Sequence, residues 1–139
     1  KVFSIASNTY FTPALYGRFV FNDNVPFVYQ NAMGGEGFNL RNEHQIPFSG
    51  FTHIEHLQRF LGSAQMKISH CFKKVHHISL SGNLAFNSNQ CSRIFKGKKI
   101  YGIGVGYGYE SPIGPIEGNI GYSNQTDKIG LHFNIGYVF

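Results

Sequence analysis

The last eleven residues, IGLHFNIGYVF, place an apolar side chain at every odd position from Ile129 to Phe139. The even positions carry small or polar residues and one valine. Because successive side chains of a strand point to opposite faces, this two-residue period predicts a strand with one apolar face. A soluble antiparallel sheet that covers a core gives the same alternation. The recurrence of the pattern along the chain must therefore decide between a soluble and a membrane sheet.

The same alternation recurs through most of the sequence. Besides 129–139, it predicts strands over 115–123, 100–110, 75–87, 64–72 and 15–21, and a less regular strand over 2–7. Most are roughly nine to eleven residues long, the length that crosses a bilayer at a tilt. No apolar run approaches the about 18 residues of a membrane-spanning helix, so insertion as helices is excluded.

The faces opposite the apolar ones favour a membrane barrel. Gly, Ser and Asn dominate them, whereas a soluble sandwich would expose Lys, Glu and Thr there. Their larger polar residues are Lys67, His77, Asn83, Glu117, His132 and Asn134. The apolar faces carry aromatics near strand ends, as interfacial girdles do: Tyr101, Tyr109, Tyr122, Tyr137 and Phe139. We therefore predict an all-β fold, an antiparallel transmembrane β-barrel with a watery interior, and keep a soluble β-barrel as the alternative.

The positive charge points to surface turns. The formal net charge of +5 comes from 12 basic and 7 acidic residues, partly clustered in Lys73-Lys74 and in Lys96 to Lys99. Both clusters fall at predicted turns, where a solvated or phosphate-rich surface is a simpler explanation than nucleic acid. We expect no nucleic-acid partner.

The segment from Phe51 to Met66 does not follow the alternation. Its apolar residues recur at helical spacing, and strand alternation gives no apolar face to residues 53–60. A short helix and an irregular rim segment both remain open for residues 51–63.

Two stretches resemble a superfamily of outer-membrane assembly and translocation proteins. Asn31 to Arg41, which contains GGEGF, resembles the inward-folded loop of that superfamily, in which a Gly-Gly pair leads to an Arg-Gly-aromatic motif. Tyr107 to Ile116 resembles its penultimate hairpin. The resemblance implies a lumen-directed loop over 26–50, with these motif residues: Gly34, Gly35, Gly37, Phe38 and Arg41.

The loop departs from the superfamily at one position. Glu36 stands where the superfamily has its Arg. Arg41 is then expected either to replace it in an inward ion pair, with Glu110 or Glu55 as the partner, or to be a solvated loop residue.

The end of the chain resembles the C-terminal sorting signal of bacterial outer-membrane proteins. The signal would consist of Phe133, Ile135, Tyr137 and Phe139 within the terminal strand 129–139. This resemblance implies localisation in the bacterial outer membrane, contact with its lipids, and recognition by the barrel assembly machinery.

Strand number suggests an incomplete barrel. The superfamily barrel has about sixteen strands, and about eight is the smallest common barrel. We therefore expect residues 1–139 to be the C-terminal portion of a larger barrel domain, or to close by pairing with other chains as a homo-oligomer. The N-terminus, which has no initiator Met or apolar leader, looks processed or cut from something longer.

Gln45 to Gly50 looks more particularly like the barrel of bacterial patatin-like phospholipases, in which the barrel follows a lipid-hydrolase domain. This resemblance implies that the chain anchors an upstream lipid acyl hydrolase domain. An extended version of the hypothesis is that the chain also exports that domain. The alternative is a barrel that inserts or translocates other proteins. The sequence has no G-x-S-x-G elbow, so we expect no catalytic residue in it.

Histidines and cysteines complete the inventory of reactive side chains. The run His53-Ile54-Glu55-His56 and the pair His76-His77 do not place three ligands on one strand face, so we expect neither a metal nor another cofactor. Cys71 and Cys91 should lie at opposite ends of a hairpin and remain free thiols.

Overall fold

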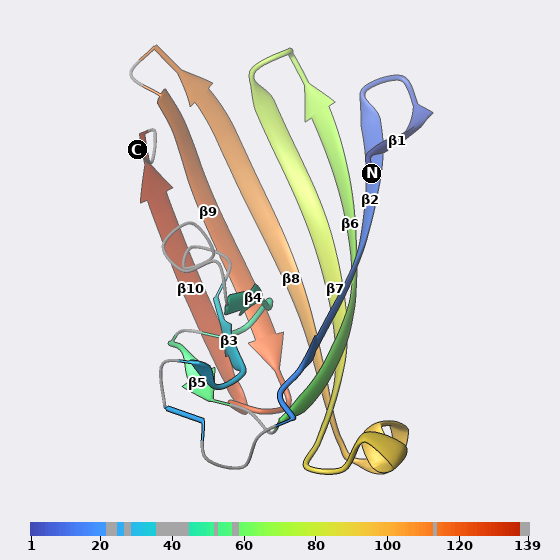
Figure 1. Cartoon of the computed structure of the whole chain (residues 1–139). Helices are drawn as coiled ribbons and strands as arrows, with labels where there is room; N and C mark the ends of the chain where they lie inside the picture. Colours follow the sequence, from blue (N-terminus) through green and yellow to red (C-terminus); the bar gives the residue numbers. More distant parts are fainter. Residues whose placement is uncertain are drawn as a thin grey trace.

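The computed structural model describes residues 1–21, 25–26, 29–35, 45–51, 53–56, 59–112 and 114–136. These residues form a seven-stranded sheet and a three-stranded sheet (Figure 1). None of the helical turns in this part of the chain is long and apolar enough to cross a membrane. The elements are β1 (Phe3–Ala6), β2 (Thr9–Phe19), β3 (Ala32–Gly34), β4 (Gln45–Pro47), β5 (Glu55–His56), β6 (Phe60–Phe72), β7 (His76–Ser88), the 3-10 segment η2 (Cys91–Lys96), β8 (Lys98–Ser111), β9 (Gly114–Ser123) and β10 (Lys128–Ile135).

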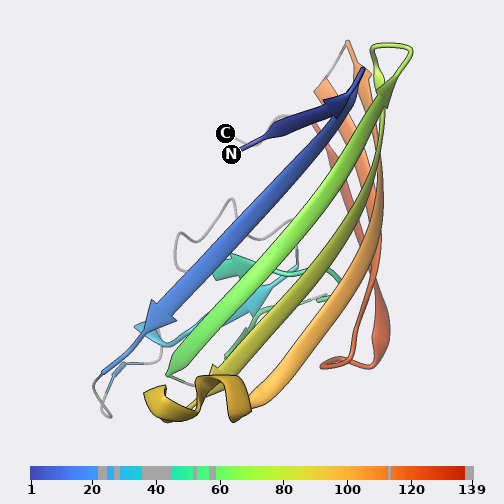
Figure 2. The same cartoon turned by 90° about the vertical axis from the view of Figure 1, so that its right-hand side faces the viewer.

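The large sheet has the order β1-β2-β6-β7-β8-β9-β10, and every neighbouring pair is antiparallel. Figure 2 shows β2, β6, β7 and β8 side by side at a common slant. The sequence prediction of an all-β, antiparallel fold is confirmed. The sheet is open: within the described residues, β1 lies at one edge, β10 at the other, and the two do not pair.

Two strands begin earlier than the alternation predicts. β6 begins at Phe60, so the helical alternative for the residues before Met66 is wrong over this part. Phe60 contacts the Phe19 ring on one face, with centroids 6.0 Å apart, while Leu61 is fully buried on the other. Apolar residues on both faces hide the strand period. β2 extends back through Pro13, which is tolerated because β1 pairs with only the first residues of β2.

One face of the large sheet carries continuous apolar rows. Residues that lie directly opposite each other share a face. One such row crosses six strands, and it consists of Phe11, Ile68, Leu80, Val105, Ile120 and Leu131. Leu131 is 73% exposed and Ile120 is 55% exposed. The apolar face predicted from the alternation is therefore present and uncovered in this chain.

Aromatic side chains gather toward both ends of this outward face. At one end, His76 stacks between Phe72 and Tyr109, with ring centroids 5.1 and 5.0 Å away. At the other end, the rings of Phe86 and Phe95 meet edge to face at 5.6 Å. This arrangement agrees with two interfacial girdles.

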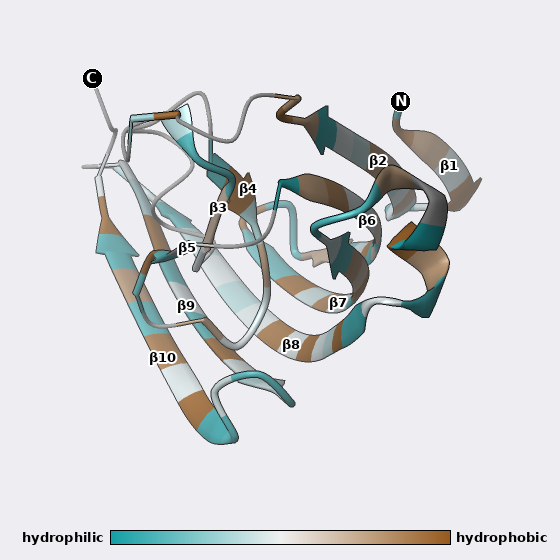
Figure 3. Cartoon of the chain, turned by 60° about the horizontal axis from the view of Figure 1, so that its bottom comes forward, coloured by the Kyte–Doolittle hydropathy of each residue, from teal (hydrophilic) through white to brown (hydrophobic). Residues whose placement is uncertain are grey.

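The opposite face is concave and holds the three-stranded sheet β4-β3-β5 (Figure 3). This small sheet was not predicted. Between the two sheets lies the buried core of the described residues: Met33, Ile46, Phe48, Phe51, Leu61, Ala85 and Ile100. Over this part, the inner face of the large sheet therefore packs against another segment of the chain and not against water.

The two cysteines are free thiols, as predicted. Cys71 is the last but one residue of β6, close to the turn that leads into β7, whereas Cys91 begins η2 just beyond the far end of β7. The length of β7 separates them.

Substitution of Phe48 tests the packing of the buried core between the two sheets. Its side chain is fully buried and contacts the Phe51 ring at 5.2 Å, so Phe48→Ala should leave a cavity and lower the free energy of unfolding by about 3–5 kcal/mol. Urea-induced unfolding in detergent micelles measures this change. Phe133→Ala, on the exposed face, is the control and should cost clearly less. Equal losses for the two variants would contradict this description of the core.

Candidate functional site

The candidate site is the segment seated on the concave face, which we call the inner segment and define as residues 29–35 and 45–51. It contributes β3 and β4, which pair in parallel through Met33 and Ile46. β5 flanks β3 on the other side in antiparallel pairing. Figures 1 and 3 show these short strands inside the curve of the large sheet.

Two inward-facing glycines, Gly102 of β8 and Gly121 of β9, allow the inner segment to contact the sheet directly, and we call them the glycine track. A Cβ atom on Gly102 would lie 2.5 Å from the Ser49 carbonyl oxygen, and one on Gly121 would lie 2.5 Å from the Gly50 nitrogen. Gly50 itself has φ +87°, and a Cβ there would lie 2.3 Å from the carbonyl carbon of Tyr122. Backbone can approach backbone this closely only where side chains are absent.

Polar side chains of β6 and β7 hold the same stretch. The Ser49 and Ser81 hydroxyl oxygens lie 2.7 Å apart within the buried region. Gln65 donates a hydrogen bond from its side-chain amide to the Pro47 carbonyl oxygen. With its amide oxygen turned toward Ser49, Asn83 accepts a hydrogen bond from the Ser49 backbone N–H at 2.6 Å. Ser81 and Asn83 on this inner face therefore bind the segment instead of facing bulk water.

Further hydrogen bonds tie the inner segment to itself and to the rim. The Phe48 backbone N–H donates to the Gly34 carbonyl oxygen at 2.8 Å. Asn31, which is 1% exposed, donates from its side-chain amide to the Arg59 carbonyl oxygen at 2.7 Å. Together with the packing of Phe48, these contacts fix the segment at several points along its length.

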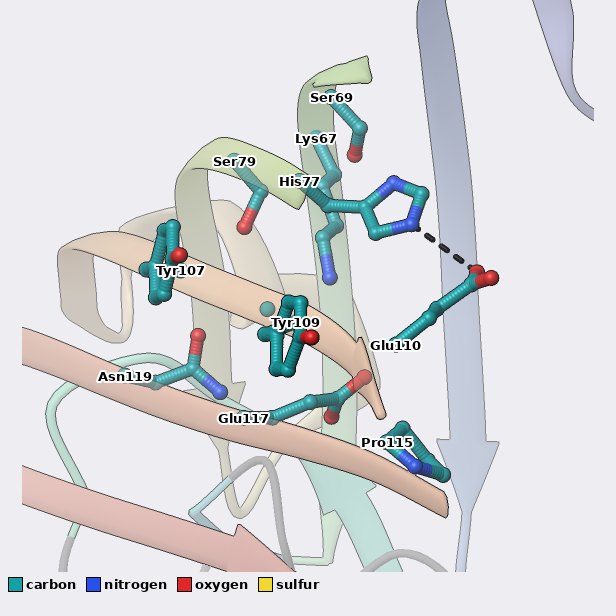
Figure 4. Close-up of a pocket in the computed structure, with 11 residues that line it drawn as sticks. Lys67, Ser69, His77, Ser79, Tyr107, Tyr109, Glu110, Pro115, Glu117 and Asn119 are labelled. Carbon is teal, nitrogen blue, oxygen red and sulfur yellow. Dashed lines mark hydrogen bonds and ion pairs between the residues drawn. The ribbon is translucent and has the colours of Figure 1, made fainter. Parts of the chain in front are cut away.

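The half of the concave face nearer the 73–75 turn is polar and open. It contains a cavity of about 310 Å³ (Figure 4). His77 Nε2 lies 3.0 Å from Glu110 Oε1 at its border. Other lining side chains are Lys67, Ser69, Ser79, Glu117 and Asn119. This half of the concave face carries polar side chains, as the alternation predicts, and the other half holds the inner segment.

The structure describes two of the five loop-motif residues. Gly34 ends β3 and Gly35 follows it, both within the buried inner segment. Gly37, Phe38 and Arg41 lie outside the described residues.

The two carboxylates proposed as partners of Arg41 have histidine neighbours. Glu110 faces His77, as described above, and Glu55 Oε1 lies 3.5 Å from His53 Nε2. The Arg41 ion pair therefore stays a prediction.

The sorting-signal residues lie elsewhere. Phe133 and Ile135 stand on the outward face of the edge strand β10, 67% and 60% exposed. Tyr137 and Phe139 lie outside the described residues. Among the described residues, Phe133 and Ile135 therefore lie on the opposite face of the sheet from Gly34 and Gly35.

Metal ligands do not assemble in the part of the chain that the structure describes, where no three His, Cys, Asp or Glu side chains gather. His53 and Glu55 form the contact given above, while His56 lies opposite Ala32 in β3.

Sequence reasoning missed Ser49 and Gly50 as contact residues. The usable signal was the run of alternating glycines at 102, 104, 106 and 108, because glycine in a strand interior marks close approach of another backbone. The glycine content indicates closely approaching strands, but it does not identify which segment approaches.

An apolar outer face with aromatic side chains toward both ends of its strands is a feature of transmembrane β-barrels. A sequence model of the OMP85 superfamily matches residues 1–139. The chain belongs to this superfamily, whose members are outer-membrane proteins. No curated protein and no solved structure matched the chain.

The glycine track gives a sharp test with an internal control. Gly121→Ala should push the inner segment off the sheet and lower the free energy of unfolding by about 1–3 kcal/mol, because its new methyl group meets backbone atoms. Gly118→Ala lies in the same strand on the outward face, where its nearest neighbour is Phe133 Cδ2 at an ordinary 3.7 Å. Limited proteolysis and urea unfolding of both variants measure the difference. If Gly118→Ala is as damaging as Gly121→Ala, the close contact is not what matters.

Proposed function

We propose that this chain forms part of the wall of an outer-membrane β-barrel, with its outward face against hydrocarbon and its inner segment inside the lumen. The exposed apolar row from Phe11 to Leu131 carries this proposal. Soluble monomers rarely expose contiguous apolar surface of this extent. Contact with lipid chains removes the free-energy cost of exposing this apolar surface to water, and the polar concave face then borders water.

The open edges must be paired in such a membrane. Unpaired backbone N–H and C=O groups cost several kcal/mol each in hydrocarbon, so spanning sheets close into barrels. We infer that β10 and the uncovered part of β2 pair with further strands. These strands come from the same polypeptide or from another copy of the chain.

The lengths of the connections support one orientation. One end of the sheet has tight turns, such as residues 73–75, while the other carries the long 20–59 connection and the η2 connection (Figure 1). Outer-membrane barrels have short periplasmic turns and longer extracellular loops. We therefore assign the 73–75 turn to the periplasm and η2 to the cell exterior.

The specific function that we favour is anchoring of an upstream lipid acyl hydrolase domain in the outer membrane. In an extended version of this proposal, the barrel also exports that domain. The resemblance of Gln45 to Gly50 to patatin-like phospholipase barrels supports it. The alternative is insertion or translocation of other proteins, which the superfamily resemblance supports. The protein sequence encoded before Lys1 separates them: a G-x-S-x-G elbow serine favours the anchor, and repeated small periplasmic α/β modules favour the translocator.

Adjacent residues of β6 test which face meets lipid. Ile68→Arg places a charge on the outward face, and we expect it to lower the stability of the inserted protein by about 2–4 kcal/mol. Ser69→Arg, one residue on, points to the polar cavity and should be tolerated. The folded fraction in phospholipid vesicles, followed by heat-dependent gel mobility, measures both. Recovery of the unmodified protein as a monodisperse soluble species without detergent would refute the membrane assignment.

The terminal residue tests the proposed sorting signal. Phe139→Asp should reduce the amount of protein assembled in the outer membrane of living cells, because the terminal aromatic is the key element of the resemblance. Val138→Asp alters the alternate, non-signal position and serves as the control. Immunoblots of membrane fractions provide the measurement, and unchanged assembly of Phe139→Asp would count against the signal.

A further inference from the structure

The 3-10 segment η2 lies against the outward face of the sheet. Ile94 Cδ1 lies 3.9 Å from the Cβ position of Gly62, which is directly opposite Phe86 in the register of β6 and β7. The Phe95 ring meets the Phe86 ring edge to face, yet Phe95 remains 75% exposed. The connection between β7 and β8 therefore rests its apolar side chains on the surface that we assign to lipid.

Four exposed cations lie in η2 and in the first two residues of β8. We call them the basic collar, and they are Arg93, Lys96, Lys98 and Lys99. Lys99 lies directly opposite Phe86 and so shares its outward face. No collar residue forms an ion pair with a carboxylate among the residues that the structure describes. The positive charge of the collar is therefore not neutralised by the described part of the protein.

This combination is typical of a segment at a membrane interface. Apolar side chains enter the boundary below the headgroups, while Lys and Arg extend their charges toward lipid phosphates. The partner must therefore combine acyl chains with phosphate groups, which soluble anions do not. At the end of the sheet that we assign to the exterior, the lipids of the outer leaflet are phosphorylated glycolipids.

We propose that η2 and the basic collar bind the phosphorylated sugar headgroups of outer-leaflet glycolipids, with Phe95 inserted among the adjoining acyl chains. This inference rests on the proposed function, because it requires the sheet to span the outer membrane in the stated orientation. The Lys73-Lys74 turn, at the opposite end of the sheet, has two cations and provides the matched comparison.

The test measures lipid binding to the native protein, purified from outer membranes in mild detergent, by native mass spectrometry. The probes are a diphosphorylated glycolipid of the lipid A type and the same lipid without its phosphates. The collar variant R93Q/K96Q/K98Q/K99Q should bind the phosphorylated lipid about tenfold or more weakly than the unmodified protein. K73Q/K74Q should bind it as the unmodified protein does, and the dephosphorylated lipid should bind all forms weakly.

Folding is checked independently, by circular dichroism and heat-dependent gel mobility. All four collar side chains are exposed, so the variant should fold; a second variant, F95S, keeps the charges and should also bind more weakly. Equal binding by the collar variant and the unmodified protein would overturn the proposal, as would full displacement of the lipid by inorganic phosphate. If the protein inserts into membranes but fails these binding tests, only the proposal of lipid binding by the basic collar is refuted. If the protein is soluble without detergent, the membrane assignment is refuted as well.

Discussion

The direct backbone contact between Ser49-Gly50 and the glycines of β8 and β9 is the constraint on which the structure depends. It lets the inner segment approach the large sheet closely enough for Phe48 to be fully buried. The buried core forms in the space between the two sheets. Without the contact, the seven-stranded sheet would have no core of its own, because its other face is apolar and exposed.

The same contact also specifies strand register. A shift of one residue between paired strands would move every side chain to the opposite face. In β8 it would place Val105 or Ile103 beneath the inner segment, where only glycine fits, and would turn glycine toward the outward face. The requirement for a close inner contact and the requirement for an apolar outer face therefore select the same register.

Sequence alone predicted much of the large sheet, because alternation is a direct consequence of strand geometry. It failed at the start of β6, where Phe60 and Leu61 are apolar on both faces, and at the start of β2, where Pro13 interrupts the pattern. The three-stranded sheet was missed because β3, β4 and β5 are too short to show a period. The resemblance names Gly34 and Gly35, whose role stays a prediction, and the contacts of Ser49 depend on strands distant in sequence. The superfamily match agrees with that resemblance, and the patatin-like relation remains a proposal.

The topology also constrains the order in which the chain can assemble. Each strand from β6 to β10 pairs with the next strand along the chain, so this part can grow by local hairpin closure. β2 pairs with β6 across the connection that contains the inner segment, and closing this longer loop has a higher entropic cost. The glycine track exists as soon as β8 pairs with β9. If the β6–β10 meander binds the inner segment first, β2 is brought close to its place beside β6. The inner segment would then act as a template for folding.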